Sequence, residues 1–320
     1  NTGEGGLSSY HLEGGCDLVF QIGTAKYGVR DAAGLLSDQR LADIALIPSV
    51  RMFEIKLSQG AKPGKGGILP AAKVNAEIAG IRGIPEGQSS ISPNRHRDIG
   101  SNSELLQRIG HIREVTGKPV GIKLVLGDPS DFECLLRDIA SAGREAAPDF
   151  VTIDSGDGGT GAAPMPLMDL VGLSVRESLP RVVDLLCRYG LRDRIRLIAS
   201  GKLMMPGDVA WALAAGADFV VSARGFMFSL GCIQALKCNK NTCPTGITTH
   251  AQRLQSGLVP TVKAEKVAGF AEGIRKEVAT IAHSCGLSEP RELSRSHVRI
   301  VQENGASIRM STLFPEQKME

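Results

Sequence analysis

The sequence predicts an α/β protein whose parallel strands form a (β/α)8 barrel. Six short apolar segments alternate with amphipathic segments between residues 52 and 225. No G-x-G-x-x-G motif follows a first strand, as it does in many doubly wound sheets. Polar residues end nearly every apolar segment, and a barrel gathers all such strand ends on one face. These polar residues are Lys56, Ser92, Lys123, Asp154, Ser200 and Arg224.

The predicted strands are apolar almost throughout, which is typical of parallel strands covered on both faces. We expect them at residues 52–58, 89–92, 119–127, 149–156, 194–200 and 217–225. Amphipathic spacing predicts the intervening helices at 70–82, 103–116, 130–143, 173–189 and 206–215.

The six predicted strands are two fewer than a complete barrel needs. The chain opens with "NTGEGG", which has the pattern of a strand end leading into a glycine loop. We therefore expect an N-terminally truncated barrel whose first strand and helix are missing. Residues 1–260 are expected to form the barrel domain, with 226–260 as a cysteine-bearing insertion after the last strand. Residues 261–320 are expected to form a C-terminal helical extension packed on the barrel.

The composition is that of a soluble globular protein, with 42% hydrophobic and 22% charged residues and a net charge of +3. The basic residues are spread out, which argues against a nucleic-acid partner. No apolar run reaches the ~18 to 20 residues of a membrane span, so no membrane segment is expected. The isolated Cys16, Cys134, Cys187 and Cys285 suggest a reducing compartment, and we expect a cytoplasmic protein.

Three further cysteines, Cys232, Cys238 and Cys243, follow the spacing C-x5-C-x4-C. The polar residues 239–241 between them do not suit a hydrophobic core. A disulfide would leave one thiol over and would conflict with the compartment. Zinc usually takes four ligands, and His250 is available as a fourth, so a zinc site stays open as an alternative.

Iron–sulfur ligation fits the cysteine spacing better. An irregular loop of thiolates can wrap an iron–sulfur cube. Three thiolates suit a three-iron cluster with one empty corner. Pro244 directly after the last cysteine is typical of ferredoxin-type runs.

Two strand ends late in the chain have the pattern of a phosphate site. In barrels, the loops after the seventh and eighth strands often bind phosphate through backbone N–H groups and a helix N-terminus. Tight turns with solvated charges are the alternative. The candidate residues are Ser200, Gly201 and Lys202 after one strand and Ala223, Arg224 and Gly225 after the next.

The segment "DSGDGGTGAAP" (154–164) has four glycines and two aspartates, so it predicts a loop over the barrel mouth. Such a loop can lie flat against a planar ligand. Lys123 would project inward from a nearby strand end. A flavin needs amide donors along one ring edge and a cation that stabilises its reduced anion. The pattern therefore favours a flavin.

Four motifs together carry a family resemblance: "NTGEGG", "EIKLSQGAKPGKGG" (54–67), "GDGGTGA" (156–162) and the C-x5-C-x4-C cysteines. The chain resembles the FMN-binding domain of glutamate synthase. It is most similar to stand-alone FMN-binding glutamate synthase family proteins, which lack the glutaminase domain. The resemblance extends from Asn1 to about residue 260.

The resemblance implies a (β/α)8 barrel that holds FMN at the strand ends, with a 3Fe–4S cluster beside it. It implies an oxidoreductase that forms glutamate from 2-oxoglutarate and ammonia, through hydride transfer from reduced flavin to 2-iminoglutarate. The implied partners are a 2-oxo acid and amino acid couple and an electron donor, either ferredoxin or a reductase subunit. A homo-oligomer is compatible with this interpretation.

Residue by residue, the resemblance makes Cys232, Cys238 and Cys243 the cluster ligands. It assigns Glu4, Lys56, Lys62 and Arg82 to the 2-oxo acid. Arg82 would bind a carboxylate bidentately, the two lysines would polarise or protonate the substrate around its keto or imino carbon, and Glu4 would position the nitrogen. The flavin shell would comprise Gln21, Lys123, Asp157, Gly158, Gly159, Thr160, Gly161, Gly201 and the stretch near Arg224.

One position departs from the family pattern. Ile68 stands where we expect a glutamine that hydrogen-bonds the 2-oxo acid. An apolar side chain there removes a donor, which favours a related amino-acid synthase, such as one forming N-methylglutamate, as an alternative. A second alternative, from a different class, is a subunit that only relays electrons through the cluster and the flavin.

Overall fold

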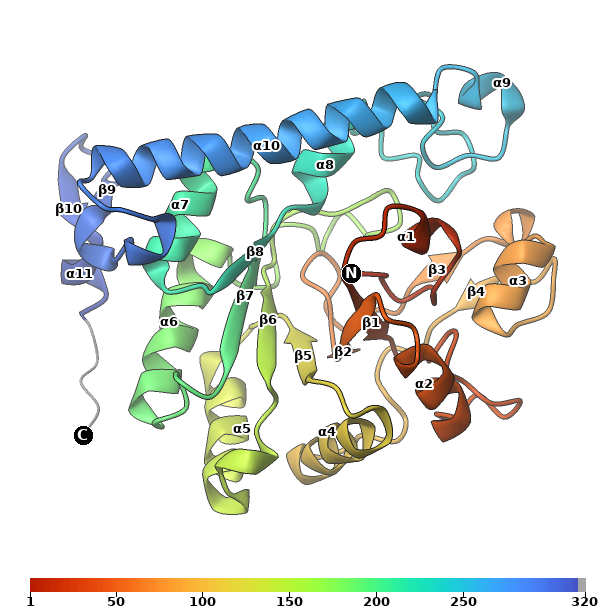
Figure 1. Ribbon diagram of the computed structural model, residues 1–320, viewed down its shortest axis with the longest axis horizontal. Coiled ribbons are helices and arrows are strands. Elements are labelled where there is room, and N and C mark those ends of the chain that lie inside the picture. Colours follow the sequence, from red (N-terminus) through yellow and green to blue (C-terminus); the bar gives the residue numbers. More distant parts are fainter. Residues whose placement is uncertain (316–320) are drawn as a thin grey trace.

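The computed structural model describes residues 1–315, and at its centre lies a curled parallel sheet of six strands. Neighbouring strands follow the order of the chain, so each crossover returns to the adjacent position. Figure 1 shows the sheet curling as an open half-barrel, consistent with a TIM-barrel-like fold. The strands, in spatial order, are β1 (Leu18–Ile22), β2 (Val50–Lys56), β5 (Val120–Leu124), β6 (Phe150–Asp154), β7 (Arg196–Ser200) and β8 (Phe219–Val221).

Helices between these strands cover the outer side of the sheet. Local capping explains several of their starts: Ser37, Ser101 and Asp128 each accept a backbone N–H from the first turn of the helix that follows. These helices are α2 (Asp38–Ala45), α4 (Asn102–Thr116), α5 (Pro129–Ala142), α6 (Val175–Arg188) and α7 (Pro206–Ala215), and α8 (Ala223–Ser229) follows the last strand of the sheet, β8.

Shorter elements surround this framework. Near the N-terminal half lie α1 (Tyr10–Glu13), β3 (Ile68–Leu69), the 3-10 turn η1 (Ala71–Lys73), α3 (Ala76–Arg82) and β4 (Ser90–Ile91). Later in the chain come the 3-10 turn η2 (Arg144–Ala146), α9 (Gln252–Gln255), α10 (Pro260–Ser284), the 3-10 turns η3 (Pro290–Glu292) and η4 (Arg295–His297), β9 (Arg299–Val301), β10 (Ser307–Arg309) and α11 (Met310–Leu313).

The core lies between the sheet and its helices. Phe20 and Phe53 from neighbouring strands are fully buried, with ring centroids 5.8 Å apart. Ile122 on β5 belongs to the same buried cluster as Ile109 of α4 and Leu136 of α5. Continuous apolar strands are therefore explained by burial on both faces.

Most sequence predictions of elements are confirmed. Four strands are shorter than predicted, β2 is shifted by two residues, and the four helices predicted after residue 100 agree within two residues at each end. Two are wrong. Residues 89–92 do not join the main sheet, because β4 has two residues and pairs antiparallel with β3. The predicted helix 70–82 is broken at Val74 and Asn75, where Asn75 caps α3 instead. The strand β1 was not predicted at all. An eight-stranded closed barrel and an N-terminal truncation stay predictions.

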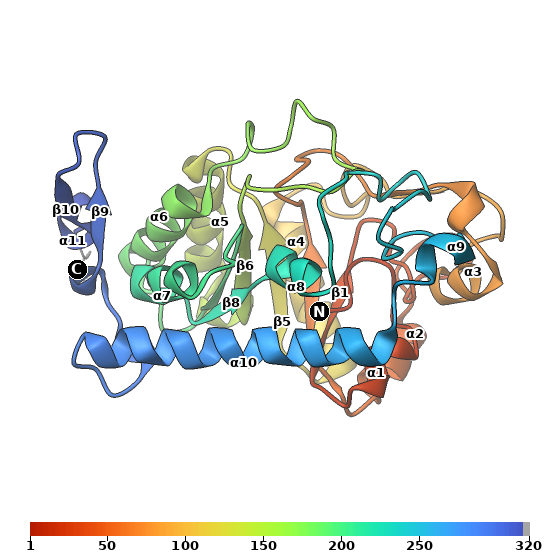
Figure 2. The same cartoon turned by 90° about the horizontal axis from the view of Figure 1, so that it is seen from above.

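The C-terminal elements pack on the same framework. α10 extends along much of the molecule, past α8 and α7, as Figures 1 and 2 show. Arg295 is buried and pairs with Asp184 of α6 at 2.7 Å, which joins the region after α10 to the helices of the sheet. The division at residue 260 stays a prediction. Within residues 1–315 no helix combines the length and the apolar character needed to cross a bilayer.

The central strand should be sensitive to loss of side-chain volume. Ile122→Ala should lower the free energy of unfolding by about 2 to 5 kcal/mol, because Ile122 is 0% exposed and its loss leaves a cavity. Urea unfolding monitored by circular dichroism measures this. The matched control is Leu46→Ala, whose side chain is 81% exposed and should change stability by less than about 0.5 kcal/mol. Equal effects would contradict this core.

Candidate active site

The carboxyl ends of three neighbouring strands are linked by polar side chains. Asp154 ends β6 and accepts a hydrogen bond from Ser200 at the end of β7 at 3.1 Å. Its other oxygen accepts from the backbone N–H of Gly60 at 3.0 Å and lies 3.8 Å from Nζ of Lys123 on β5. Asp154 therefore ties the loop after β2 to the ends of β5, β6 and β7.

Glu4, Lys56 and Lys62 lie together, as the resemblance implies. Nζ of Lys56, which ends β2, donates to Oε2 of Glu4 at 2.9 Å and to Oε1 of Gln59 at 2.8 Å. Burial lowers the pKa of Lys56, the Glu4 carboxylate opposes that shift, and the charges of Lys123 and Lys62 add to it. Burial also lowers the pKa of Lys62, again opposed by Glu4. Lys56 and Lys62 thus form an electropositive group, and the Glu4 carboxylate interacts with both.

Two glycines make the position of Glu4 attainable. A Cβ at Gly67 would lie 1.9 Å from Oε1 of Glu4, and a Cβ at Gly23 would lie 2.8 Å from its Cβ. Side chains at these positions would therefore displace the carboxylate from Lys56. A cavity of about 20 Å³ next to this group has room for one water molecule.

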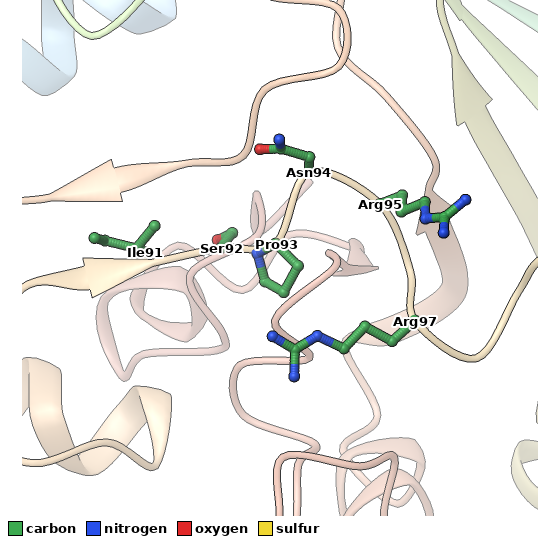
Figure 3. Close-up of a pocket in the computed structure, with 6 residues that line it drawn as sticks. All are labelled: Ile91, Ser92, Pro93, Asn94, Arg95 and Arg97. Atoms are coloured by element: carbon green, nitrogen blue, oxygen red, sulfur yellow. The ribbon is translucent and has the colours of Figure 1, made fainter.

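The loop after β4 forms a wall of the site. His96 is buried and its Nε2 lies 3.0 Å from the carbonyl oxygen of Lys56, which fixes the loop to the end of β2. Burial lowers the pKa of His96. A larger cavity of about 560 Å³ opens along this loop, and Figure 3 shows its lining residues Ile91, Ser92, Pro93, Asn94, Arg95 and Arg97.

Arg82 lies apart from the lysine group. Its guanidinium stacks on Tyr27 at 4.9 Å from the ring centroid and donates to Ser90 at 2.9 Å. It also approaches Gly5, where a Cβ would lie 3.4 Å from Nη2. The structure thus places Arg82 behind the N-terminal loop that carries Glu4, and no contact links it to Lys56 or Lys62.

The glycine loop predicted to bind the flavin is held by its own polar residues. Asp157 accepts hydrogen bonds from Ser155 at 2.8 Å and from the backbone of Val175 at the start of α6 at 2.9 Å. Asp169 accepts from Gly158 at 2.7 Å.

The two cations predicted for a phosphate both contact this loop. Lys202 pairs with Asp169 at 2.7 Å, and Arg224 donates to the carbonyl of Gly159 at 3.1 Å. Lys202 and Arg224 therefore already interact with protein groups of this region, and these interactions help to hold the loop in place. The buried Ser222 hydroxyl, just before Ala223, has no hydrogen-bond partner among the described residues. Sequence reasoning missed Ser222, although it directly precedes the predicted phosphate residues.

Gln21 lies inside the half-barrel. Its side chain donates at 2.6 Å to Glu54, which is 1% exposed and also accepts from Thr152 at 2.6 Å and from Asn1 at 2.9 Å. Glu54 was missed by sequence reasoning. The available signal was a carboxylate within the apolar strand "VRMFEIK", two positions before Lys56 and so on the same face.

The cysteine segment lies against the glycine loop. A Cβ at Gly161 would lie 2.3 Å from the carbonyl oxygen of Leu236 and 2.9 Å from the backbone nitrogen of Cys238, so the two backbones are in direct contact. Figure 2 shows the cyan segment around residues 230–251 beside the yellow-green loop that follows β6.

The three clustered cysteines are free and half-buried. Burial opposes ionisation of Cys243, but hydrogen bonds from Thr245 and Thr248 outweigh it and lower its pKa to about 6, so the thiolate that binds iron is favoured. Within the part of the chain that the structure describes, no three His, Cys, Asp or Glu side chains are grouped closely enough to hold a single metal ion. The zinc alternative with His250 therefore has no preformed site.

The fold and this site define an α/β protein with a curled, TIM-barrel-like parallel sheet and a cationic site at its strand ends. The model for the conserved region in glutamate synthase matches residues 1–288. The chain belongs to the glutamate synthase family, and glutamate synthases are oxidoreductases.

Relatives agree with this family over most of the chain. The glutamate synthase large subunit-like protein YerD of Bacillus subtilis is 44% identical over 314 residues, covering 98% of this chain and 59% of YerD. The NADPH-type archaeal glutamate synthase of Methanocaldococcus jannaschii is 34% identical over 301 residues, covering 93% of this chain and 55% of the relative. The chain thus spans little more than half the length of these relatives.

Among solved structures, a double mutant of flavocytochrome b2 with pyruvate bound is similar in fold. The TM-score is 0.50 at 16% sequence identity, and the match covers 87% of this chain and 52% of that chain. At this identity the likeness concerns the fold alone.

The contact between Glu4 and Lys56 makes a testable electrostatic prediction. Glu4→Gln should lower the pKa of Lys56 further, because the carboxylate is what opposes the burial shift. The pH at which Lys56 reaches half-maximal acetylation by acetic anhydride, followed by mass spectrometry, should then fall. The exposed Lys65 is the internal control, and its labelling should not respond. A midpoint for Lys56 that stays put or rises would contradict the pairing.

Proposed function

We propose that this chain is the flavin- and iron–sulfur-dependent catalytic domain of a glutamate synthase-type enzyme. It would form glutamate from 2-oxoglutarate and ammonia, with FMN and a 3Fe–4S cluster as cofactors and a ferredoxin or reductase subunit as electron donor. When bound, FMN would supply the hydride that reduces the imino carbon of 2-iminoglutarate. Relatives of this chain carry the glutamate synthase name, and a structural neighbour of similar fold is a flavoprotein.

One observation supports this proposal most strongly. The predicted flavin loop touches the cysteine segment through Gly161, and Asp154 ties the end of the strand before that loop to the loop between Lys56 and Lys62. Three motifs that lie far apart in the sequence therefore converge at one end of the sheet. A flavoenzyme fed by an iron–sulfur cluster needs this convergence, since electrons must pass from cluster to flavin and then to substrate.

The residues present are chemically suited to both cofactors. For FMN, the buried Ser222 hydroxyl offers an unpaired donor beside the backbone N–H groups of 223–225, and Lys123 offers a cation. For the cluster, the lowered pKa of Cys243 favours the thiolate form, and a multi-iron cluster does not require its ligands to converge on one ion. Cys232 and Cys238 would supply the other thiolates.

The protein's own groups would act on the substrate as follows. Lys56 and Lys62 would hold the 2-oxo or imino group in an electropositive setting, and one of them would carry the proton that is taken up. Glu4 would fix the Lys56 ammonium and orient the nitrogen of the substrate. Arg82 would contribute through the N-terminal loop, since its contacts with Tyr27, Ser90 and Gly5 hold that loop in place.

The proposal is tested by anaerobic reconstitution of the chain with iron, sulfide and FMN. We expect the EPR signal of an oxidised three-iron cluster, a bound yellow flavin, and glutamate formation when 2-oxoglutarate, ammonia and a reductant are supplied. A colourless protein would overturn both cofactors. Flavin reduction without any amino-acid product would instead identify an electron relay.

Ile68 gives a second test, which concerns the substrate. Ile68 is 54% exposed on β3, and its backbone pairs with that of the exposed Ile91 of β4, which lines the cavity in Figure 3. Ile68→Gln should tighten 2-oxoglutarate binding about tenfold, since a hydrogen bond to a charged group is worth ~1.5 kcal/mol. Isothermal titration calorimetry measures this.

The matched control for Ile68 is Leu69→Gln, because successive strand residues point to opposite faces. It should leave the affinity unchanged. Unchanged or weaker binding for Ile68→Gln would favour another 2-oxo acid or an amine other than ammonia as the substrate.

A further inference from the structure

Lys73 links the substrate side of the site to the cysteine segment. It ends η1, only a few residues after the loop that carries Lys62, and is 8% exposed. Its ammonium donates to the carbonyl oxygen of Cys238 at 3.1 Å and to that of Thr248 at 2.8 Å. These two carbonyls flank Cys243 on either side. Lys73 thus clamps the middle of the cysteine segment from a position 165 residues away.

Lys73 carries an ammonium group although it is almost completely buried, which is unusual. A buried ammonium is costly unless a negative group compensates it. Within residues 1–315, Lys73 forms no ion pair with a carboxylate, whereas Lys56 pairs with Glu4. Burial lowers the pKa of Lys73, and negative charge on Cys238 and Cys243 opposes the shift. The groups that can place negative charge opposite Lys73 are therefore Cys238 and Cys243 in their thiolate form.

We propose that Lys73 is the positioning residue of the iron–sulfur site: it holds the cysteine segment in place and sets the reduction potential of the cluster through its positive charge. This rests on the proposed function. Reduction adds one electron to the cluster from the ferredoxin or reductase donor, so the negative charge beside Lys73 grows. A fixed cation stabilises the reduced form more than the oxidised form and raises the potential. Lys73 also connects the cysteine segment to the part of the chain that directly follows the loop carrying Lys62.

Two substitutions separate the effect of the hydrogen bonds that Lys73 donates from the effect of its positive charge. Lys73→Gln keeps a hydrogen-bond donor but removes the charge, and Lys73→Arg keeps the charge. The matched control is Lys240→Met, which removes an exposed charge from the same segment between Cys238 and Cys243. All four proteins, the unaltered chain included, are reconstituted anaerobically as full chains, and the cluster is titrated potentiometrically by EPR. Iron per chain is measured in parallel.

We expect Lys73→Gln to retain its iron but to shift the ratio of oxidised to reduced cluster about tenfold at a fixed potential. For a one-electron couple this is a midpoint ~59 mV lower. Lys73→Arg and Lys240→Met should stay near the unaltered protein. A midpoint for Lys73→Gln equal to that of the unaltered chain, at equal iron content, would overturn the electrostatic role. A shift of the same size in Lys240→Met would also overturn it, because any charge on the segment would then suffice.

The clamp is tested without iron. In the iron-free full chain, Lys73→Met should make Cys238 and Cys243 react several-fold faster with iodoacetamide, as followed by mass spectrometry, while Cys134 on α5 reacts at its former rate. Equal rates in the two chains would overturn the clamp. If the unaltered chain assembles no cluster, the proposed function fails, whereas the labelling still decides whether Lys73 holds the segment. If Lys73→Met does not fold, the labelling is repeated with Lys73→Gln. The glutamine can still donate hydrogen bonds, so Cys238 and Cys243 should stay protected. Loss of that protection would contradict a clamp made by hydrogen bonds.

Discussion

Direct contact between backbones holds the loops together at the carboxyl ends of the strands, and glycine makes that contact possible. A Cβ at Gly60 would lie 1.4 Å from the carbonyl oxygen of Ser155, and a Cβ at Gly66 would lie 1.9 Å from that of Ser92. Gly161 approaches the cysteine segment in the same way. Any larger residue at these positions would push two loops apart. The glycine-rich motifs therefore decide which loops meet, and only then do the charged residues on those loops acquire neighbours.

These contacts concentrate positive charge. Lys56, Lys62 and Lys123 lie close enough that the charges of the other two lower the pKa of Lys56, and burial lowers it more. Lys56 and Lys123 are neighbours because β2 and β5 pair in register, so the sheet itself fixes their separation. Lys62 is on the loop after β2, which the hydrogen bond from Gly60 to Asp154 ties to the end of β6. The carboxylates of Glu4 and Asp154 offset part of the repulsion.

Local sequence features were sufficient to predict most of the sheet. Strands such as 149–156 and 194–200 are continuous apolar segments, and burial on both faces requires that pattern. β1 was missed because "LVFQI" is short and contains Gln21, whose reason for being there is the buried Glu54 on the next strand. Residues 89–92 were misassigned because β4 depends on β3, which local pattern does not reveal.

The sequence predicted which residue types form the site better than it predicted which of these residues contact one another. Glu4, Lys56 and Lys62 meet as the family resemblance implies, while Arg82 is committed to Tyr27 and Ser90. Lys73 could not have been singled out, since its partners lie more than 160 positions away and are backbone carbonyls, which carry no sequence signal. Long-range contacts of this kind depend on the assembled fold.

Charge and rigidity together limit which ligands the site can accept. Lys56 already donates to Glu4 and Gln59, so an incoming carboxylate must compete with Glu4 or use the third N–H of that ammonium. A neutral or cationic ligand would gain nothing from the three lysines and would displace favourable contacts. Under the proposed function, an anionic 2-oxo acid would gain attraction from Lys56, Lys62 and Lys123 at once, and a fixed geometry would require little reorganisation when it binds. Selectivity for an acidic substrate would then follow from the arrangement of these three lysines at the strand ends.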